Sequence, residues 1–176
     1  MPMPKLSFVT GGARSGKSVL AERLTRLGPA PHHYIATAEA WDDEMRERIA
    51  RHRADRGAGW ITHEAPLDLP AALSAARGTV LIDCATLWLT NQMLGGLDLV
   101  AATLGLLAAL HKAPGALVIV SNEVGWGIVP ENALARAFRD AQGRLNQRLA
   151  AQADLAIAVI AGLPMVLKGQ MPEGAA

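Results

Sequence analysis

A glycine-rich segment near the N-terminus carries residues suited to chemistry on phosphates. Between a short apolar run and a helix-like pattern the chain reads GGARSGKS, which matches the spacing G-x-x-x-x-G-K-[ST]. Glycines let backbone N–H groups turn inward, and the start of the following helix adds positive potential, so such a loop attracts an anion. The motif therefore predicts a site for a nucleotide phosphate, without saying which reaction follows. The predicted phosphate-binding residues are Gly11, Gly12, Ala13, Arg14, Ser15, Gly16, Lys17 and Ser18.

Two acidic residues follow apolar runs that are typical of buried strands. Asp83 ends the run VLID, and Glu123 comes directly after LVIVSN. Beside a phosphate-binding loop, a carboxylate at Asp83 is suited to hold Mg²⁺ directly or through water, opposite the hydroxyl of Ser18. An aspartate at this position could instead cap the start of a helix. Glu123 precedes a loop with two glycines, and the sequence leaves open whether it is a second acid or orients a substrate.

His52 lies in a segment, residues 42–56, that is acidic early and basic late. This order of charges suits the dipole of a surface helix, so the residues by themselves favour a solvated helix without a chemical task. The other four histidines show no metal-ligand spacing with His52, and we expect no structural zinc.

Short and long apolar patterns alternate along the chain and must position these residues. The alternation predicts a single α/β domain over residues 1–176, with a mostly parallel central sheet flanked by helices on both faces. Ligands of such folds bind at the carboxyl ends of the strands. Pro66 and Pro130 are read as helix-start signals. The predicted strands are Leu6–Thr10, His33–Thr37, Trp60–His63, Thr79–Asp83, Leu117–Asn122, Leu155–Ile160 and, more weakly, Met165–Lys168. The predicted helices are Lys17–Leu27, Asp42–Arg56, Leu67–Ala76, Leu97–His111 and Ala133–Ala153.

The composition excludes several classes of protein. A chain of 176 residues with 51% hydrophobic and 19% charged residues can bury a core and is not disordered. Its net charge of +1 gives no general attraction to nucleic acid or anionic membrane. The single cysteine, Cys84, excludes an internal disulfide and favours a reducing cytoplasm. The most lipid-like stretch, Leu97–Leu110, is too short to span a bilayer. We expect a cytoplasmic protein that acts on small molecules.

Several stretches together resemble the bifunctional adenosylcobinamide kinase/adenosylcobinamide-phosphate guanylyltransferase family of cobalamin assembly. They occur in order from residue 10 to about residue 169. A phosphate-binding loop is shared by very many enzymes, whereas NEVGWGIVP on the same chain is far more specific. One departure is Gly57, which follows Arg56 where the family usually has proline. The stretches that carry the resemblance are TGGARSGKS (10–18), YIAT (34–37), DDEM (42–45), RIARHR (48–53), WITHE (60–64), DC (83–84), NEVGWGIVP (122–130) and FRDAQGRLNQRLA (138–150).

The resemblance implies a three-layer P-loop NTPase-like fold and site roles that the residues alone do not indicate. In this family a histidine at the position of His52 attacks the α-phosphate of GTP. Lys17 would act with it as a catalytic residue, Ser18 and Asp83 would hold Mg²⁺, and GTP or ATP would be a substrate, with no permanently bound cofactor. The family also suggests a homotrimer, built through Ile128–Pro130 and the helix over residues 139–148. The further nucleotide contacts we expect are Ala36, Thr37, Arg53, Arg56 and Glu64.

The implied chemistry has two stages. A nucleoside triphosphate phosphorylates adenosylcobinamide, and His52 then passes GMP from GTP to the product, giving adenosylcobinamide-GDP. The leading alternative is a P-loop kinase for a small metabolite or nucleotide, with one activity. A nucleotide-driven binding module and a guanylyltransferase without kinase activity stay open as well. The sequence identifies no general base for the kinase step beyond the candidate Glu123.

Overall fold

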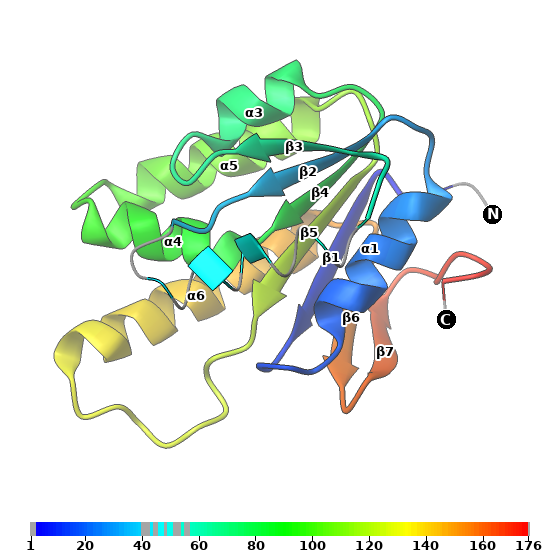
Figure 1. Cartoon of the computed structure of the whole chain (residues 1–176). Helices are drawn as coiled ribbons and strands as arrows, with labels where there is room; N and C mark the ends of the chain where they lie inside the picture. The colour runs from blue at the N-terminus through cyan, green and yellow to red at the C-terminus, as the bar shows by residue number, and fades with distance from the viewer. Residues whose placement is uncertain are drawn as a thin grey trace.

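The central feature of the molecule is a mostly parallel sheet. The computed structural model describes residues 3–39, 43, 46–47, 49–50, 54 and 57–175. Within these residues a seven-stranded sheet has the order β3-β2-β4-β5-β1-β6-β7 (Figure 1). Neighbouring strands are parallel except for β6 and β7, which form an antiparallel hairpin. The expectation of a mostly parallel sheet is confirmed. The strands are β1 (Leu6–Gly11), β2 (His32–Ala36), β3 (Trp60–Glu64), β4 (Thr79–Asp83), β5 (Leu117–Asn122), β6 (Leu155–Ile160) and β7 (Leu163–Lys168).

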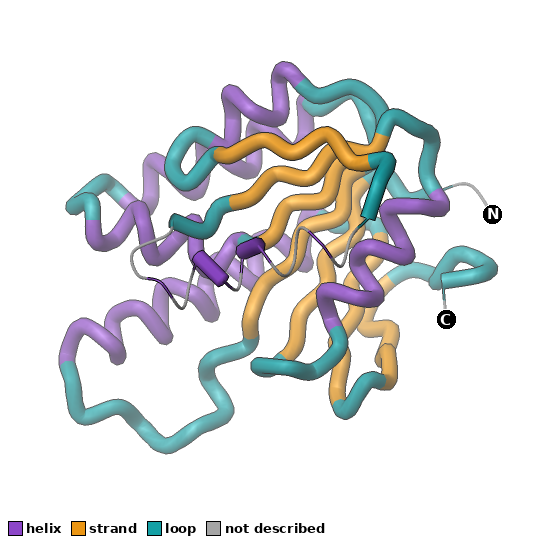
Figure 2. The backbone as a smooth tube through the Cα atoms, viewed as in Figure 1, coloured by secondary structure: helices purple, strands orange, loops and turns teal. Residues whose placement is uncertain are grey.

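Helices cover both faces of the sheet and give three layers (Figures 1 and 2). Side chains alternate between the two faces of a strand, so each strand feeds two cores. In β1, Phe8 belongs to the core beneath most of the helices, whereas Val9 packs with Leu24 on the opposite face. The helix on that opposite face is α1 (Lys17–Leu27), and the others are α3 (Leu69–Ala75), α4 (Ala85–Leu94), α5 (Leu99–Lys112) and α6 (Ala133–Gln152).

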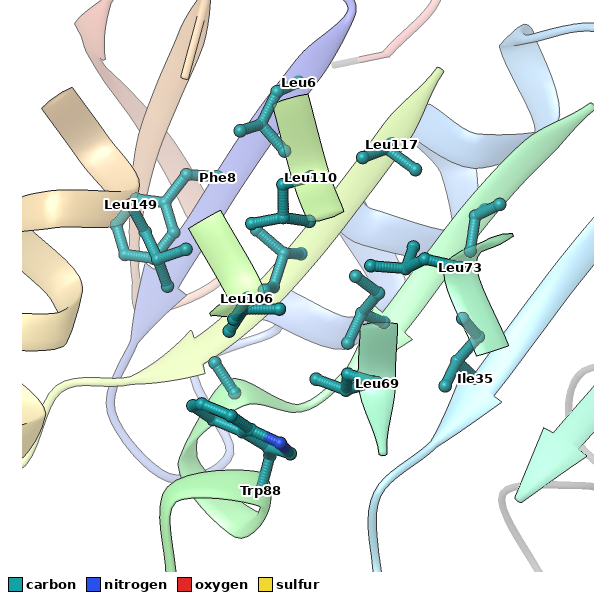
Figure 3. Close-up of a cluster of buried hydrophobic side chains, with 14 of the residues drawn as sticks. Leu6, Phe8, Ile35, Leu69, Leu73, Trp88, Leu106, Leu110, Leu117 and Leu149 are labelled. Carbon is teal, nitrogen blue, oxygen red and sulfur yellow. The ribbon is translucent and has the colours of Figure 1, made fainter. Parts of the chain in front are cut away.

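The larger core lies between the sheet and helices α3 to α6 (Figure 3). Trp88 of α4 is 1% exposed there, and its Nε1 donates a hydrogen bond to the carbonyl oxygen of Leu67 at 2.9 Å. The indole therefore contributes a large apolar surface without leaving its polar N–H unpaired. This packing holds α4, which begins two residues after β4 ends, against the sheet on the side of the larger core.

The sequence patterns do not predict helix α4. Its buried positions include Thr86, Asn91 and Gln92 beside apolar residues. Because buried polar residues interrupt the hydrophobic periodicity, the helix has no clear amphipathic stripe. The expected start of α3 at Leu67, taken from Pro66, is also wrong by two residues. Asp68 is the N-cap and accepts a hydrogen bond from the N–H of Ala71 at 3.0 Å, so the helix begins after it.

The remaining helices begin close to their predicted positions. Asn132 caps α6, whose start at Ala133 is as predicted, and Asp98 caps α5. The predicted helix over residues 42–56 lies largely outside the described residues, although positions 43, 46, 47, 49, 50 and 54 are helical. No helix in the described part of the chain is long and apolar enough to cross a membrane.

Candidate active site

The phosphate-binding loop connects β1 to α1, as the motif requires. Gly16 has φ of 95° at the N-cap of α1, a left-handed conformation that favours glycine. Lys17 is the first residue of α1, and its Nζ donates to the carbonyl oxygen of Gly12 at 3.2 Å. The N–H of Ser15 donates to the same carbonyl at 3.3 Å. The loop therefore curls over the start of α1, where backbone amides and the helix dipole attract an anion.

The turn between β6 and β7 supports this loop from the side (Figure 1). The N–H of Gly162 donates to the carbonyl oxygen of Ser15 at 2.9 Å. A Cβ at Gly16 would lie 3.3 Å from the Cα of Gly162, and a Cβ at Gly11 would lie 2.6 Å from the carbonyl oxygen of Val159. Glycines at these positions thus let the loop pack against the β6–β7 hairpin.

Two buried hydroxyls in this region have no hydrogen-bond partner among the described residues. They are Oγ1 of Thr10 and Oγ of Ser15. A buried polar group without a partner costs about 1–3 kcal/mol. The loop therefore offers polar atoms whose partners are not supplied by the described protein, as expected where a polar ligand binds.

Asp83 lies at the carboxyl end of β4, half-buried, beside Ala36 of β2 and Val120 of β5. The hydroxyl of Tyr34 donates to its Oδ2 at 2.9 Å. Asp83 is not the cap of α4, because the N-cap is Cys84, whose Sγ accepts from the N–H of Leu87. The carboxylate of Asp83 therefore does not serve as a helix cap. It provides oxygen atoms at this edge of the sheet, and oxygen is the ligand that Mg²⁺ prefers.

Cys84, next to Asp83, is not suited to nucleophilic chemistry. The residue is 5% exposed. Burial, and to a lesser extent the neighbouring Asp83, raises the pKa of the Cys84 thiol to about 11. The thiolate, which is the reactive form, is therefore scarce near neutral pH.

Thr37 joins the ends of β2 and β4. It has no exposed surface, and its Oγ1 donates to the carbonyl oxygen of Cys84 and accepts from the N–H of Cys84, both at 2.7 Å. Asn91 of α4 donates through Nδ2 to the carbonyl oxygen of Thr37 at 2.9 Å. The Thr37 hydroxyl thus links the carboxyl ends of β2 and β4 within the fold. The nucleotide contact expected of Thr37 stays a prediction. Ala36 and Glu64 end neighbouring strands at the same edge, and Glu64 is exposed.

Glu123 directly follows β5, which lies between β1 and β4 in the sheet. Its N–H donates to the carbonyl oxygen of Gly11 at 3.0 Å, so it adjoins the phosphate-binding loop. Its Oε1 accepts from the N–H of Gly125 at 2.6 Å. The topology therefore places Glu123 between the loop and the strand that ends at Asp83.

A buried polar network beneath Glu123 ties α6 to β5. Asn146 donates through Nδ2 to the carbonyl oxygen of Asn122 at 3.1 Å and accepts through Oδ1 from Ser121 at 2.6 Å. Gln142 donates to Ser121 and Asn146, and the N–H of Asn122 donates to Thr86 of α4. The segment FRDAQGRLNQRLA and the stretch YIAT, which contains Tyr34, carry the family resemblance, but that resemblance does not predict these hydrogen bonds. Polar residues inside helical or strand patterns were the available signal.

His52, Arg53 and Arg56 lie outside the described residues, so their predicted roles stay predictions. The structure places the phosphate-binding loop, Glu123 and Asp83 at the carboxyl ends of the successive strands β1, β5 and β4. Glu64 lies at the same edge of the sheet but at the end of the outermost strand, β3. The strand ends that form this edge can be followed in Figure 1.

Comparison with known proteins identifies the family to which this arrangement belongs. A sequence model of the family described as cobinamide kinase / cobinamide phosphate guanyltransferase matches residues 7–167. The chain belongs to this family. The bifunctional adenosylcobalamin biosynthesis protein CobP of Pseudomonas aeruginosa is 47% identical over 168 residues, which cover 93% of this chain and 97% of that protein. The bifunctional adenosylcobalamin biosynthesis protein CobU of Salmonella typhimurium is 44% identical, with 92% and 98% covered.

Membership in the cobinamide kinase / cobinamide phosphate guanyltransferase family supports the bifunctional interpretation over a kinase with one activity. A solved structure from a study of a type III secretion ATPase of pathogenic bacteria is similar in fold, with a TM-score of 0.53 at 14% identity. The match covers 97% of this chain and 60% of the ATPase chain. This likeness concerns the fold alone, and it confirms the expected P-loop NTPase-like architecture.

Proposed function

We propose that this chain catalyses both reactions for which its family is named, with adenosylcobinamide and then its phosphate as acceptors. The observation that carries the proposal is the family match over residues 7–167, which includes the phosphate-binding loop and Asp83. In the first reaction an acceptor hydroxyl attacks the γ-phosphorus of a nucleoside triphosphate, whose β–γ bridging P–O bond breaks. In the second, GMP moves from GTP to the new phosphate.

For the kinase step, the loop amides and Lys17 would bind the β- and γ-phosphates, and Ser18 with Asp83 would hold Mg²⁺. The oxygen donors and the edge position of Asp83 fit this ion, which would neutralise charge on the phosphates. Glu123 adjoins the loop through its N–H bond to Gly11. It is the candidate to orient the acceptor hydroxyl and accept its proton.

For the transfer step, His52 would attack the α-phosphorus of GTP through a ring nitrogen, and pyrophosphate would leave. An oxygen of the phosphorylated acceptor would then attack the same phosphorus, and the N–P bond to His52 would break. A neutral imidazole is a good nucleophile near pH 7, and arginines such as Arg53 and Arg56 would stabilise the charge that develops. Glu64 and the backbone of Ala36 are candidate nucleotide contacts at this edge.

The decisive experiment uses GTP labelled at the α-phosphate. The protein is incubated with Mg²⁺ and labelled GTP, denatured, and tested for label retained on the chain, beside His52→Ala. We expect an acid-labile, alkali-stable label in the native protein and none in His52→Ala, because a phosphoramidate has that stability pattern.

Two further variants complete the experiment: one tests the kinase step, and the other is a control at an exposed residue. Lys17→Ala should lose phosphorylation of the acceptor, and His111→Ala, an exposed residue at the end of α5, should retain the label. If the native protein carries no label while the acceptor is still phosphorylated, the transferase half of the proposal is wrong and a kinase with one activity remains.

The loop after β5 supports a further part of the proposal, a homotrimer. Its apolar side chains are unusually exposed, with Trp126 at 76%, Ile128 at 97% and Val129 at 61%. Large apolar side chains exposed close together along one loop are typical of interaction sites. We place the contact between subunits at this loop and the adjoining α6.

A further inference from the structure

The hydroxyl of Tyr34 makes a hydrogen bond that the two proposed reactions leave unexplained. Tyr34 lies in β2 opposite Leu81 of β4, and its OH reaches two residues toward the carboxyl edge to donate to Oδ2 of Asp83 at 2.9 Å. Tyr34 is 5% exposed and Asp83 is half-buried. A hydrogen bond to an ionised carboxylate is shorter and stronger than a neutral one, so it restricts rotation of the carboxylate.

The phenol ring of Tyr34 packs on the face of the sheet that α1 covers. It lies edge-on to the indole ring of Trp60 in β3, with ring centroids 6.2 Å apart and ring planes at 89°. The guanidinium of Arg26 lies over the Trp60 ring at 5.2 Å from its centroid. Edge-on aromatic contacts and cation–π contacts both stabilise a ring beyond the burial of its apolar area. The hydroxyl therefore stands on a packed aromatic support.

This geometry divides the two carboxylate oxygens of Asp83 between two tasks. With Oδ2 bonded to Tyr34, Oδ1 has no donor among the described residues and remains available at the edge of the sheet. Mg²⁺ prefers an octahedral set of single oxygen contacts, several of them water, over a chelating carboxylate. A carboxylate with one oxygen already bonded presents one oxygen in a fixed direction.

We propose that Tyr34 is a positioning residue for the metal-binding carboxylate: it bonds Oδ2 of Asp83 so that Oδ1 faces the Mg²⁺ of the bound nucleotide. This inference rests on the proposed function, in which Asp83 holds that ion. Residues that orient metal ligands typically contribute 10- to 100-fold in metal affinity or activity. Tyr34 touches neither nucleotide nor metal in this role, so its effect must pass through Asp83.

The test measures how strongly Mg²⁺ and nucleotide assist each other's binding. Affinity for a fluorescent, non-hydrolysable GTP analogue is measured without Mg²⁺ and at saturating Mg²⁺, and the ratio is the coupling. We expect Tyr34→Phe to reduce this ratio about tenfold while leaving the affinity without Mg²⁺ unchanged. Asp83→Asn should reduce it as well, and the double variant should show no further loss. Thr79→Val is the matched control. It also removes a buried hydroxyl, which lies at the opposite end of β4 from Asp83 and donates to the carbonyl oxygen of Pro29 at 2.8 Å.

A spectroscopic readout keeps the phenol hydroxyl of Tyr34 in place and so does not depend on how well Tyr34→Phe folds. Tyr34 is the only tyrosine in the chain, so 3-fluorotyrosine labels this position alone. We expect its ¹⁹F resonance to shift when Mg²⁺ is added to the nucleotide complex, and not to shift in Asp83→Asn. The Tyr34 role is overturned if Asp83→Asn reduces the coupling but Tyr34→Phe does not, or if Tyr34→Phe reduces it equally in the Asp83→Asn background. If Asp83→Asn instead keeps the full ratio of affinities with and without Mg²⁺, then Asp83 does not bind the metal. That result contradicts this part of the proposed function.

Discussion

At the scale of single residues, the site separates reactive groups from residues that hold them. Asp83 and its neighbour Cys84 stand side by side, yet only the carboxylate is partly exposed. The Sγ of Cys84 caps α4, and the backbone N–H and carbonyl groups of Cys84 form hydrogen bonds with the Thr37 hydroxyl. The DC pair is therefore one candidate ligand followed by one structural residue, even though both side chains are capable of chemistry.

This separation predicts that the Cys84 thiol is inert in the folded protein. Because its pKa is about 11, only about one thiol in a thousand is ionised at pH 8. An aromatic disulfide reagent at pH 8 should leave the native protein unmodified over the time in which it fully modifies the chain in guanidinium chloride. Rapid stoichiometric reaction of the native protein would contradict the packing around α4.

At the scale of elements, β5 decides how the site is spaced. It lies between β1, which carries the phosphate-binding loop, and β4, which ends at Asp83. Since neighbouring strands are about 4.8 Å apart, the two strands stand about 10 Å apart in the sheet. Because β5 fills this interval, Glu123, which follows β5, lies between the phosphate-binding loop and Asp83 along the carboxyl edge of the sheet. The β6–β7 hairpin fixes the opposite side of the loop through Gly162.

Adjacent glycines of the loop should differ sharply when each is replaced by alanine. A Cβ at Gly11 would lie 2.5 Å from Oγ of Ser15 and 2.6 Å from the carbonyl oxygen of Val159, whereas a Cβ at Gly12 meets nothing within 4 Å. Gly11→Ala should cost about 1–3 kcal/mol of unfolding free energy and disrupt GTP binding, because backbone must shift. The unfolding free energy of the Gly12→Ala variant should lie within about 0.5 kcal/mol of the value for the native protein. Thermal and denaturant unfolding with a GTP-binding assay measure both, and equal effects would contradict the described loop.

At the scale of the whole molecule, stability should depend on pH through a histidine pair between β2 and β3. Nδ1 of His33 lies 2.8 Å from Nε2 of His63, and the two rings are stacked. His33 is 6% exposed, and burial, aided by the neighbouring His63, lowers the pKa of His33 below its ordinary value of 6.5. The unfolded chain therefore binds protons at this residue more readily than the folded chain.

It follows that the contribution of His33 to the unfolding free energy is fully present above about pH 6.5 and is lost as the pH drops below that value. Denaturant unfolding between pH 8 and pH 5 measures the slope. His33→Phe should flatten it, and His111→Gln, a change at an exposed residue on α5, should not. A slope that is unchanged in His33→Phe would assign the pH dependence to other groups.

The assembly is the second property at this scale. If the loop after β5 joins subunits, Ile128→Asp should convert a trimer to monomers in sedimentation velocity, because a charge would be buried against apolar surface. Leu104→Asp changes a residue that is 55% exposed on α5 and should leave the assembly intact. A native protein that sediments as a monomer at micromolar concentration would contradict the proposed trimer.

The amino-acid sequence by itself determined the strands, the phosphate-binding loop and the mostly parallel sheet, because these depend on local features: apolar runs, glycine spacing and a helix start. It also indicated the family, through motifs that need no coordinates. Only the tertiary structure decided that Cys84, and not Asp83, caps α4. It also decided that the Thr37 hydroxyl forms hydrogen bonds with the backbone of Cys84, and that the Tyr34 hydroxyl donates to Asp83. Each of these depends on residues 47 or 49 positions apart in the chain, or on a helix whose buried polar residues conceal its periodicity. Contacts between such distant residues follow from the strand order β2-β4-β5-β1, which no local pattern in the sequence specifies.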